Sequence, residues 1–150
     1  RRAVLGLPAR VRDDHIPRVT YTDPELAHVG PDAEAVERRY GSRAQVLRVD
    51  YAQNDRAQAE GRTEGFVKLT VAKGRVVAAT VVGAQAGEVI APLALAVAAR
   101  MKVSALAGAV LPYPTLAELG KRAAGAYFSP KLFDNAALKG WVRLVQRLLP

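Results

Sequence analysis

The sequence contains no cysteine and only two histidines, His15 and His28, in 150 residues. Without cysteine, the chain alone cannot provide a disulfide framework, a thiolate zinc site, an iron–sulfur cluster or a cysteine nucleophile. His15 and His28 have no partner residue at metal-ligand spacing, so we expect no metal site. With only two histidines, a Ser-His-Asp triad within this chain is not expected either. The composition therefore argues against most complete enzymes.

Long apolar runs and targeting signals are also missing. The longest apolar stretch, residues 89–99, contains Pro92 and stops at Arg100, which makes it too short to cross a bilayer. The chain begins Arg1-Arg2-Ala3-Val4, with no start methionine and no apolar segment behind it, so no secretory signal is predicted. We therefore expect a cytoplasmic location and interpret the chain as part of a longer protein.

The sequence does have the composition of one globular domain and an excess of positive charge. Apolar residues make up 50% and the mean hydropathy is +0.01, enough for one sizeable core. The net charge is +8, and residues 121–150 carry 6 basic residues against 1 acidic residue. Aromatic residues are only 6% and no run of five basic residues occurs, so nucleic acid is not an expected partner.

Apolar periodicity predicts alternating strands and helices. Strands are expected at residues 18–22, 44–51, 65–71 and 75–83. Helices are expected at residues 31–40, 54–61, 87–101, 104–107, 115–128 and 135–149. The Lys73-Gly74 pair predicts a hairpin between the last two strands, because Gly74 accepts a positive φ. This order predicts an α+β fold, a mainly antiparallel β-sheet with helices packed on it.

Finer details follow from the same patterns. Strand 44–51 places Leu47 and Val49 on one face and Val46 on the other. Strand 75–83 is apolar on both faces, so we expect it to be central and covered on both sides. Thr22 and Glu25 have the spacing of a capping box, and Pro31 suits the first position of the following helix.

The most informative segment is Leu111-Pro112-Tyr113-Pro114-Thr115-Leu116-Ala117-Glu118. Each proline disfavours helix for the residue before it, so Tyr113 stands on a stiff, extended loop. The segment resembles the HPTxxE motif of the carboxy-terminal dimerisation domain of pyridine nucleotide–disulfide oxidoreductases, with Tyr113 at the position of the His and Glu118 at that of the Glu. Residues 16–30 resemble the "TDPE…VG" strand and turn of that family, and residues 82–90 resemble its "G..AGE.I" passage.

This resemblance implies a fold and a function. In the family this domain follows an FAD domain and an NAD(P)H domain, forms the homodimer, and lends its His–Glu pair to the opposite subunit. Pro112, Tyr113 and Pro114 would then contact the flavin, with Tyr113 and Glu118 as catalytic candidates. Tyrosine in place of His resembles the mercuric-reductase-like branch. Without its FAD and NAD(P)H domains, the chain is expected to bind no cofactor and to be inactive.

Structural alternatives exist for both catalytic candidates. Tyr113 is also explained as a rigid packing residue between two prolines. Glu118 follows Thr115 at the spacing of a capping box, and this explains both residues without catalysis. At neutral pH a tyrosine is a hydrogen-bond donor and a poor proton shuttle, because its ordinary pKa is about 10.

The predicted organisation has three parts: a linker over residues 1–15, the dimerisation domain over 16–128, and a basic amphipathic extension over 129–150. In the helix at 135–149, Lys139, Arg143 and Arg147 share one face, and Trp141 lies on the apolar face. We favour docking of this helix on protein. The alternative function is a stand-alone basic module that docks on an anionic membrane or an acidic protein through this helix.

Overall fold

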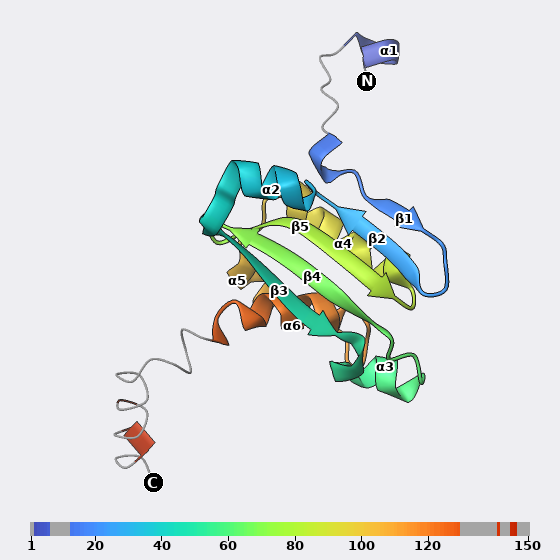
Figure 1. Cartoon of the computed structure of the whole chain (residues 1–150), viewed down its shortest axis with the longest axis vertical. Helices are drawn as coiled ribbons and strands as arrows, with labels where there is room; N and C mark the ends of the chain where they lie inside the picture. Colours follow the sequence, from blue (N-terminus) through green and yellow to red (C-terminus); the bar gives the residue numbers. More distant parts are fainter. Residues whose placement is uncertain (1, 7–12, 130–140, 142–144, 147–150) are drawn as a thin grey trace.

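The computed structural model describes residues 2–6, 13–129, 141 and 145–146 (Figure 1). The strands are β1 Arg18–Thr20, β2 Glu25–Val29, β3 Ala44–Asp50, β4 Gly65–Ala72 and β5 Arg75–Gly83. The helices are α1 Arg2–Leu5, α2 Ala33–Tyr40, α3 Asp55–Ala59, α4 Ala86–Ala98, α5 Val103–Ala107 and α6 Glu118–Ala126. Short 3-10 turns are η1 Asp13–His15, η2 Gly41–Arg43 and η3 Tyr51–Gln53.

The five strands form one sheet in the order β1-β2-β5-β4-β3, and every neighbouring pair is antiparallel. This confirms the predicted α+β fold and the central position of β5. The β4–β5 hairpin turns at Lys73 and Gly74, whose φ angles are 52° and 69°. Two consecutive positive φ values define the tight turn that the Lys73-Gly74 pair predicts.

Helices cover one face of this sheet. α4 packs on β2 and β5, while α6 packs on β3 and β4, and Figure 1 shows α4, α5 and α6 behind the strands. Leu47 and Val49 are buried toward these helices and Val46 is 60% exposed, as the alternation predicts. On β5 the expectation of cover on both sides was too strong, because Thr80 and Val82, which alternate with the buried Val81, are only half-buried.

Two sequence interpretations around the first turn are wrong. Glu25 does not cap a helix after Thr22: it begins β2, a strand that the periodicity did not predict. Its carboxylate instead accepts a hydrogen bond from the backbone N–H of Gly87 at 2.9 Å, close to the start of α4. α2 is capped by Asp32, whose carboxylate accepts from the N–H of Ala35 at 2.8 Å, and not opened by Pro31.

The ends of the chain fall mostly outside the described residues. The helix predicted at 135–149 is described only at residues 141, 145 and 146, so its docking partner stays a prediction. The predicted linker contains α1 and η1 among its described residues. In the part of the chain that the structure describes, no helix is both long and apolar enough to span a bilayer.

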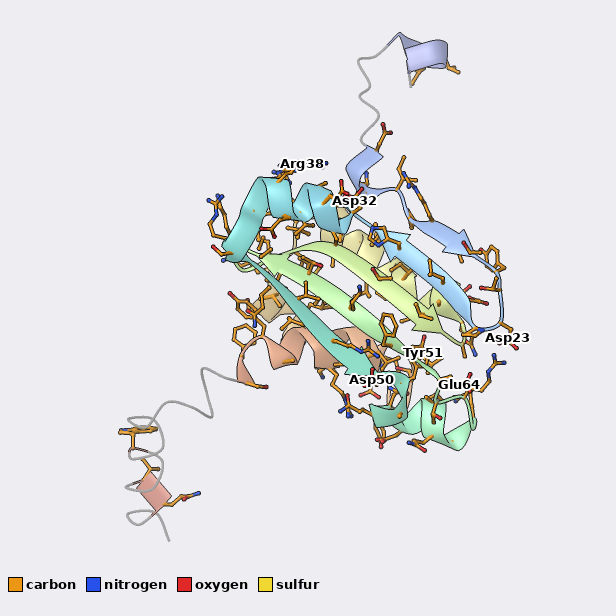
Figure 2. All side chains as sticks on the ribbon, in the orientation of Figure 1. Asp23, Asp32, Arg38, Asp50, Tyr51 and Glu64 are labelled. Atoms are coloured by element: carbon orange, nitrogen blue, oxygen red, sulfur yellow. The ribbon has the colours of Figure 1, made fainter. Side chains whose placement is uncertain are left out.

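Tyr51 closes the core at the end of β3 (Figure 2). Its ring is fully buried, and its hydroxyl donates to the carbonyl oxygen of Ala84 at 3.0 Å. Burial raises the pKa of Tyr51 above its ordinary value, and the charge of Glu25 raises it further. The folded protein therefore holds this tyrosine in its neutral form.

We expect Tyr51→Phe to lower the free energy of unfolding by about 1–2 kcal/mol at pH 7, because the Ala84 carbonyl loses its buried donor. The difference from the wild type should shrink above about pH 10. There the unfolded chain releases the Tyr51 proton while the folded chain keeps it, so wild-type stability falls as pH rises. Urea unfolding between pH 7 and pH 11 measures both effects. Tyr21→Phe is the control, since Tyr21 is 80% exposed; a constant difference across the range would contradict the titration of Tyr51.

Candidate functional site

The loop between α5 and α6 carries the predicted site residues. Pro112 and Pro114 bracket Tyr113, and the Tyr113–Pro114 peptide bond is cis. Thr115 donates through its hydroxyl to the carbonyl oxygen of Pro112 at 2.8 Å, which closes the loop on itself. The tyrosine therefore projects from a backbone with little freedom to move.

A buried asparagine ties this loop to the rest of the domain. Asn54 is 1% exposed, and its side-chain amide donates to the carbonyl oxygen of Thr115 at 3.0 Å. Its side-chain oxygen accepts from the N–H of Ala57 at 3.0 Å and so caps α3. One side chain thus holds the start of α3 and the loop in a fixed relation, and satisfies both of its polar groups in doing so.

Tyr113 is held by the residue that follows Asn54. Its hydroxyl donates to a carboxylate oxygen of Asp55 at 2.6 Å, a short charge-assisted bond. The ring remains 69% exposed. The hydrogen bond to Asp55 and the charge of that carboxylate raise the pKa of Tyr113 above its ordinary value, while Arg122 acts in the opposite direction. Tyr113 is therefore an oriented, protonated group at neutral pH.

Glu118 lies at the first position of α6 and is only half-buried. Its carboxylate accepts from the backbone N–H of Thr115 at 3.4 Å, which is one half of the capping box that the sequence suggests. The other half is absent, because the Thr115 hydroxyl bonds to Pro112. The charge of Glu118 also contributes to the raised pKa of Tyr113, so the loop places the two predicted catalytic candidates in electrostatic contact.

A small cavity of about 250 Å³ lies beside the loop. Arg56, Glu60 and Glu88 line it together with the loop residues from Pro114 to Ala117. Of the three residues proposed to contact a cofactor, only Pro114 lines this cavity; Pro112 and the ring of Tyr113 are exposed on the outer surface. Sites that enclose drug-sized ligands or cofactors usually measure roughly 300–1,000 Å³, so the cavity is too small to enclose a dinucleotide.

The local sequence pattern does not identify Asn54 and Asp55 as parts of this site. An asparagine before a helix is a recognisable cap signal, but the bonds to Thr115 and Tyr113 span 61 and 58 residues. His28 has a hydrogen-bonding role between β2 and β5. His28 lies within hydrogen-bond distance of the Thr80 hydroxyl at 3.0 Å and of the Gly30 carbonyl at 3.1 Å. Across the described residues, no three His, Asp or Glu side chains group as metal ligands would.

Known proteins share this fold and sequence. The family model "Pyridine nucleotide-disulphide oxidoreductase, dimerisation domain" matches residues 16–124. Dihydrolipoyl dehydrogenase of Bacillus subtilis (strain 168) is 36% identical over 124 residues, which cover 81% of this chain and 26% of that protein. Mercuric reductase of Acidithiobacillus ferrooxidans is 39% identical over 127 residues, 83% of this chain and 23% of that protein. The crystal structure of LpdA from Mycobacterium tuberculosis has a TM-score of 0.76 at 29% identity, covering 84% of this chain and 28% of that one.

The chain therefore belongs to the family of pyridine nucleotide-disulphide oxidoreductase dimerisation domains, which confirms the resemblance seen in the sequence. It spans about a quarter of the length of the curated relatives it matches. The family match favours a dimerisation domain over a stand-alone binding module. Relatives named dihydrolipoyl dehydrogenase and mercuric reductase match at similar identity, so the mercuric-reductase-like branch stays a prediction.

Proposed function

We propose that this chain is the dimerisation domain of an FAD- and NAD(P)H-dependent disulfide reductase and that it completes the active site of the opposite subunit. The observation that carries the proposal is the Tyr113 loop. The loop is stiff, it is tied to the core through Asn54, and it presents an exposed hydroxyl that Asp55 orients. An exposed group held this firmly suits contact with a second protein surface better than packing within the domain.

The flavin and the nicotinamide would be held by other domains. The 250 Å³ cavity beside the loop is too small for a dinucleotide. Pro112, Tyr113 and Pro114 would instead contact, from outside this cavity, a flavin that another domain binds. When bound, the flavin supplies the electron transfer between nicotinamide and thiol. Tyr113 has a single O–H, so it would turn its hydrogen bond from Asp55 toward a developing thiolate, with Asp55 as the residue that positions the hydroxyl beforehand and Glu118 supporting the loop. By itself the chain is expected to be inactive.

The surface of the domain supports assembly as a homodimer. Leu95 on α4 is 70% exposed, Val110 in the segment after α5 is 95% exposed, and Tyr113 is 69% exposed. Where such side chains form one continuous patch, burial against a partner is favoured. A second copy is the partner that the dimerisation-domain family suggests. The expected cytoplasmic location stays a prediction of the same proposal.

We expect the 150-residue chain and the longer enzyme that contains it to be dimers at micromolar concentration. For the isolated chain, light scattering should give about twice its mass of 16.1 kDa. The double variant Leu95→Glu, Val110→Glu should shift both proteins toward monomer, because each change introduces a charge that a close interface would bury unpaired. Val46→Glu is the matched control, since Val46 is 60% exposed on the sheet face away from the helices. Wild-type protein that stays monomeric at about 200 μM in both forms would overturn the proposal.

A further inference from the structure

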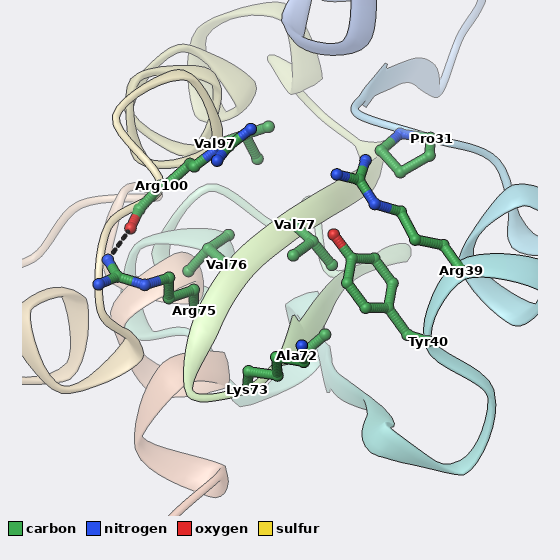
Figure 3. Close-up of a pocket in the computed structure, with 10 residues that line it drawn as sticks. All are labelled: Pro31, Arg39, Tyr40, Ala72, Lys73, Arg75, Val76, Val77, Val97 and Arg100. Atoms are coloured by element: carbon green, nitrogen blue, oxygen red, sulfur yellow. Dashed lines mark hydrogen bonds between the residues drawn. The ribbon is translucent and has the colours of Figure 1, made fainter.

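A second cavity, of about 330 Å³, surrounds the first residues of β5 (Figure 3). Arg39 and Tyr40 from α2 lie on one side of the strand, and Val97 and Arg100 lie on the other. The lining includes four cationic side chains, those of Arg39, Lys73, Arg75 and Arg100, and no acidic residue among those the structure describes. The remaining lining is mostly apolar, with the ring of Tyr40 at one wall.

The four cations come from three parts of the chain, which are α2, the β4–β5 hairpin and the end of α4, and they have no carboxylate partner in its described part. The ion pairs of the described residues lie elsewhere, for example Arg38 with Glu34 on the outer side of α2. Arg75 donates to the carbonyl oxygen of Arg100 at 2.6 Å, which fixes its guanidinium at the edge of the cavity. The guanidinium carbon of Arg39 lies 5.4 Å from the centre of the Tyr40 ring. Like charges gathered around one cavity repel each other unless an anion enters.

The backbone provides an independent observation. In the described residues, only Lys73, Gln85 and Arg100 have a positive φ without being glycine, and two of these three line the cavity. Lys73 has φ 52° in the hairpin turn, and Arg100 has φ 48° just after the end of α4. Glycine is the favoured residue at both kinds of position. Lys73 and Arg100 instead place long cationic side chains at these positions, in a backbone conformation that is disfavoured for residues other than glycine. Such strain indicates that the two side chains have a function.

We propose that this cavity binds a small organic phosphate with two or more phosphate groups, of the size of a nucleoside diphosphate. Guanidinium groups pair with phosphate oxygens in a planar, two-pronged geometry, and three of the four cations are arginines. Val77 and the Tyr40 ring, which lie on the same side of the strand in Figure 3, provide an apolar wall for the organic part. The volume lies at the lower end of the roughly 300–1,000 Å³ of ligand pockets, which suits a mononucleotide.

The test is titration of ADP into the 150-residue chain at low salt, followed by calorimetry and amide NMR shifts. Saturable binding at one site is expected, with shifts centred on Arg39, Lys73, Arg75 and Arg100. Arg39→Glu and Arg100→Glu should each weaken binding at least tenfold. Arg38→Glu is the matched control, because it makes the same charge change one residue away on α2 but does not line the cavity. We expect it to weaken binding less than threefold.

Lys73→Gly separates a binding role from a structural one. Glycine relieves the positive φ of the turn, so the melting temperature should stay the same or rise, while the ADP affinity should fall severalfold. Three results would overturn the proposal: no saturable ADP binding at millimolar concentration, equal weakening by Arg38→Glu and Arg39→Glu, or unchanged affinity in Lys73→Gly. Equal affinity for inorganic pyrophosphate and ADP would contradict the role of the apolar wall.

Discussion

Gly65→Ala is expected to destabilise the domain by about 4 kcal/mol, a large part of the 5–15 kcal/mol that stabilises a typical domain. Gly65 begins β4 with a φ of 119°, a region that residues other than glycine rarely adopt. An added Cβ would also overlap the carbonyl group of Val82 on the neighbouring strand. That neighbour is backbone of the central strand β5, so it cannot move aside without disturbing the end of the β4–β5 pairing.

Thermal unfolding measures this effect directly. At roughly 2–4 °C per kcal/mol for a chain of this length, the melting temperature should fall by roughly 8–16 °C. Gly125→Ala provides a control of opposite sign. An added Cβ at Gly125 in α6 meets no atom within 4 Å, and alanine is the better helix former by about 0.5–1 kcal/mol. A melting temperature of Gly65→Ala within a few degrees of the wild type would show that the strand relaxes around the new side chain.

The second large effect concerns catalysis in the full-length enzyme that we propose. Tyr113→Phe should slow the thiol half-reaction on the order of 100-fold, the usual loss when one oriented hydrogen-bond donor is removed from an active site. Flavin reduction by NAD(P)H should be unchanged, because Tyr113 would act only on the thiol. Rapid-mixing absorbance measurements separate the two half-reactions. If the variant and the wild type have equal rates in both half-reactions, the role of Tyr113 is packing alone.

Asp55→Asn tests the positioning of Tyr113. The amide oxygen still accepts the hydrogen bond, but the carboxylate charge that helps to raise the pKa of Tyr113 is gone. Tyr113 must be protonated to donate, so its contribution is lost as pH rises through its pKa. The alkaline limb of the thiol half-reaction should therefore move to lower pH in Asp55→Asn. Tyr21→Phe serves as the control, and an alkaline limb that does not move would exclude Asp55 as the positioning residue.

Local patterns predicted several features correctly. The Lys73-Gly74 pair marked its hairpin, because the turn depends on the conformations of two adjacent residues. The alternation in β3 assigned Leu47 and Val49 to one face and Val46 to the other, since successive strand residues point to opposite faces. The structure shows that Leu47 and Val49 are the buried ones. The Tyr113 loop was expected to be stiff because two prolines restrict it, and the structure adds that Asn54 and Asp55 hold it in place.

The same local reasoning failed where a local motif competed with a distant partner. Thr22 and Glu25 have capping-box spacing, yet the carboxylate of Glu25 bonds to Gly87, 62 residues further along the chain. β2 was not predicted because Glu-Leu-Ala-His-Val does not alternate between polar and apolar residues: Leu26 and Ala27 are adjacent. It becomes a strand by pairing with β1 on one side and β5 on the other.

Because the chain has no cysteine, it cannot by itself supply a disulfide, a thiolate metal site or a cysteine nucleophile. Three motifs in order indicated the family, and the order of the predicted strands and helices indicated the α+β fold, because these signals lie within short segments. Only the tertiary structure placed Asp55 against Tyr113, and Arg39 near Lys73 and Arg100. The physical reason is that sequence periodicity reports conformation over a few residues, whereas such contacts depend on the order in which the strands pair.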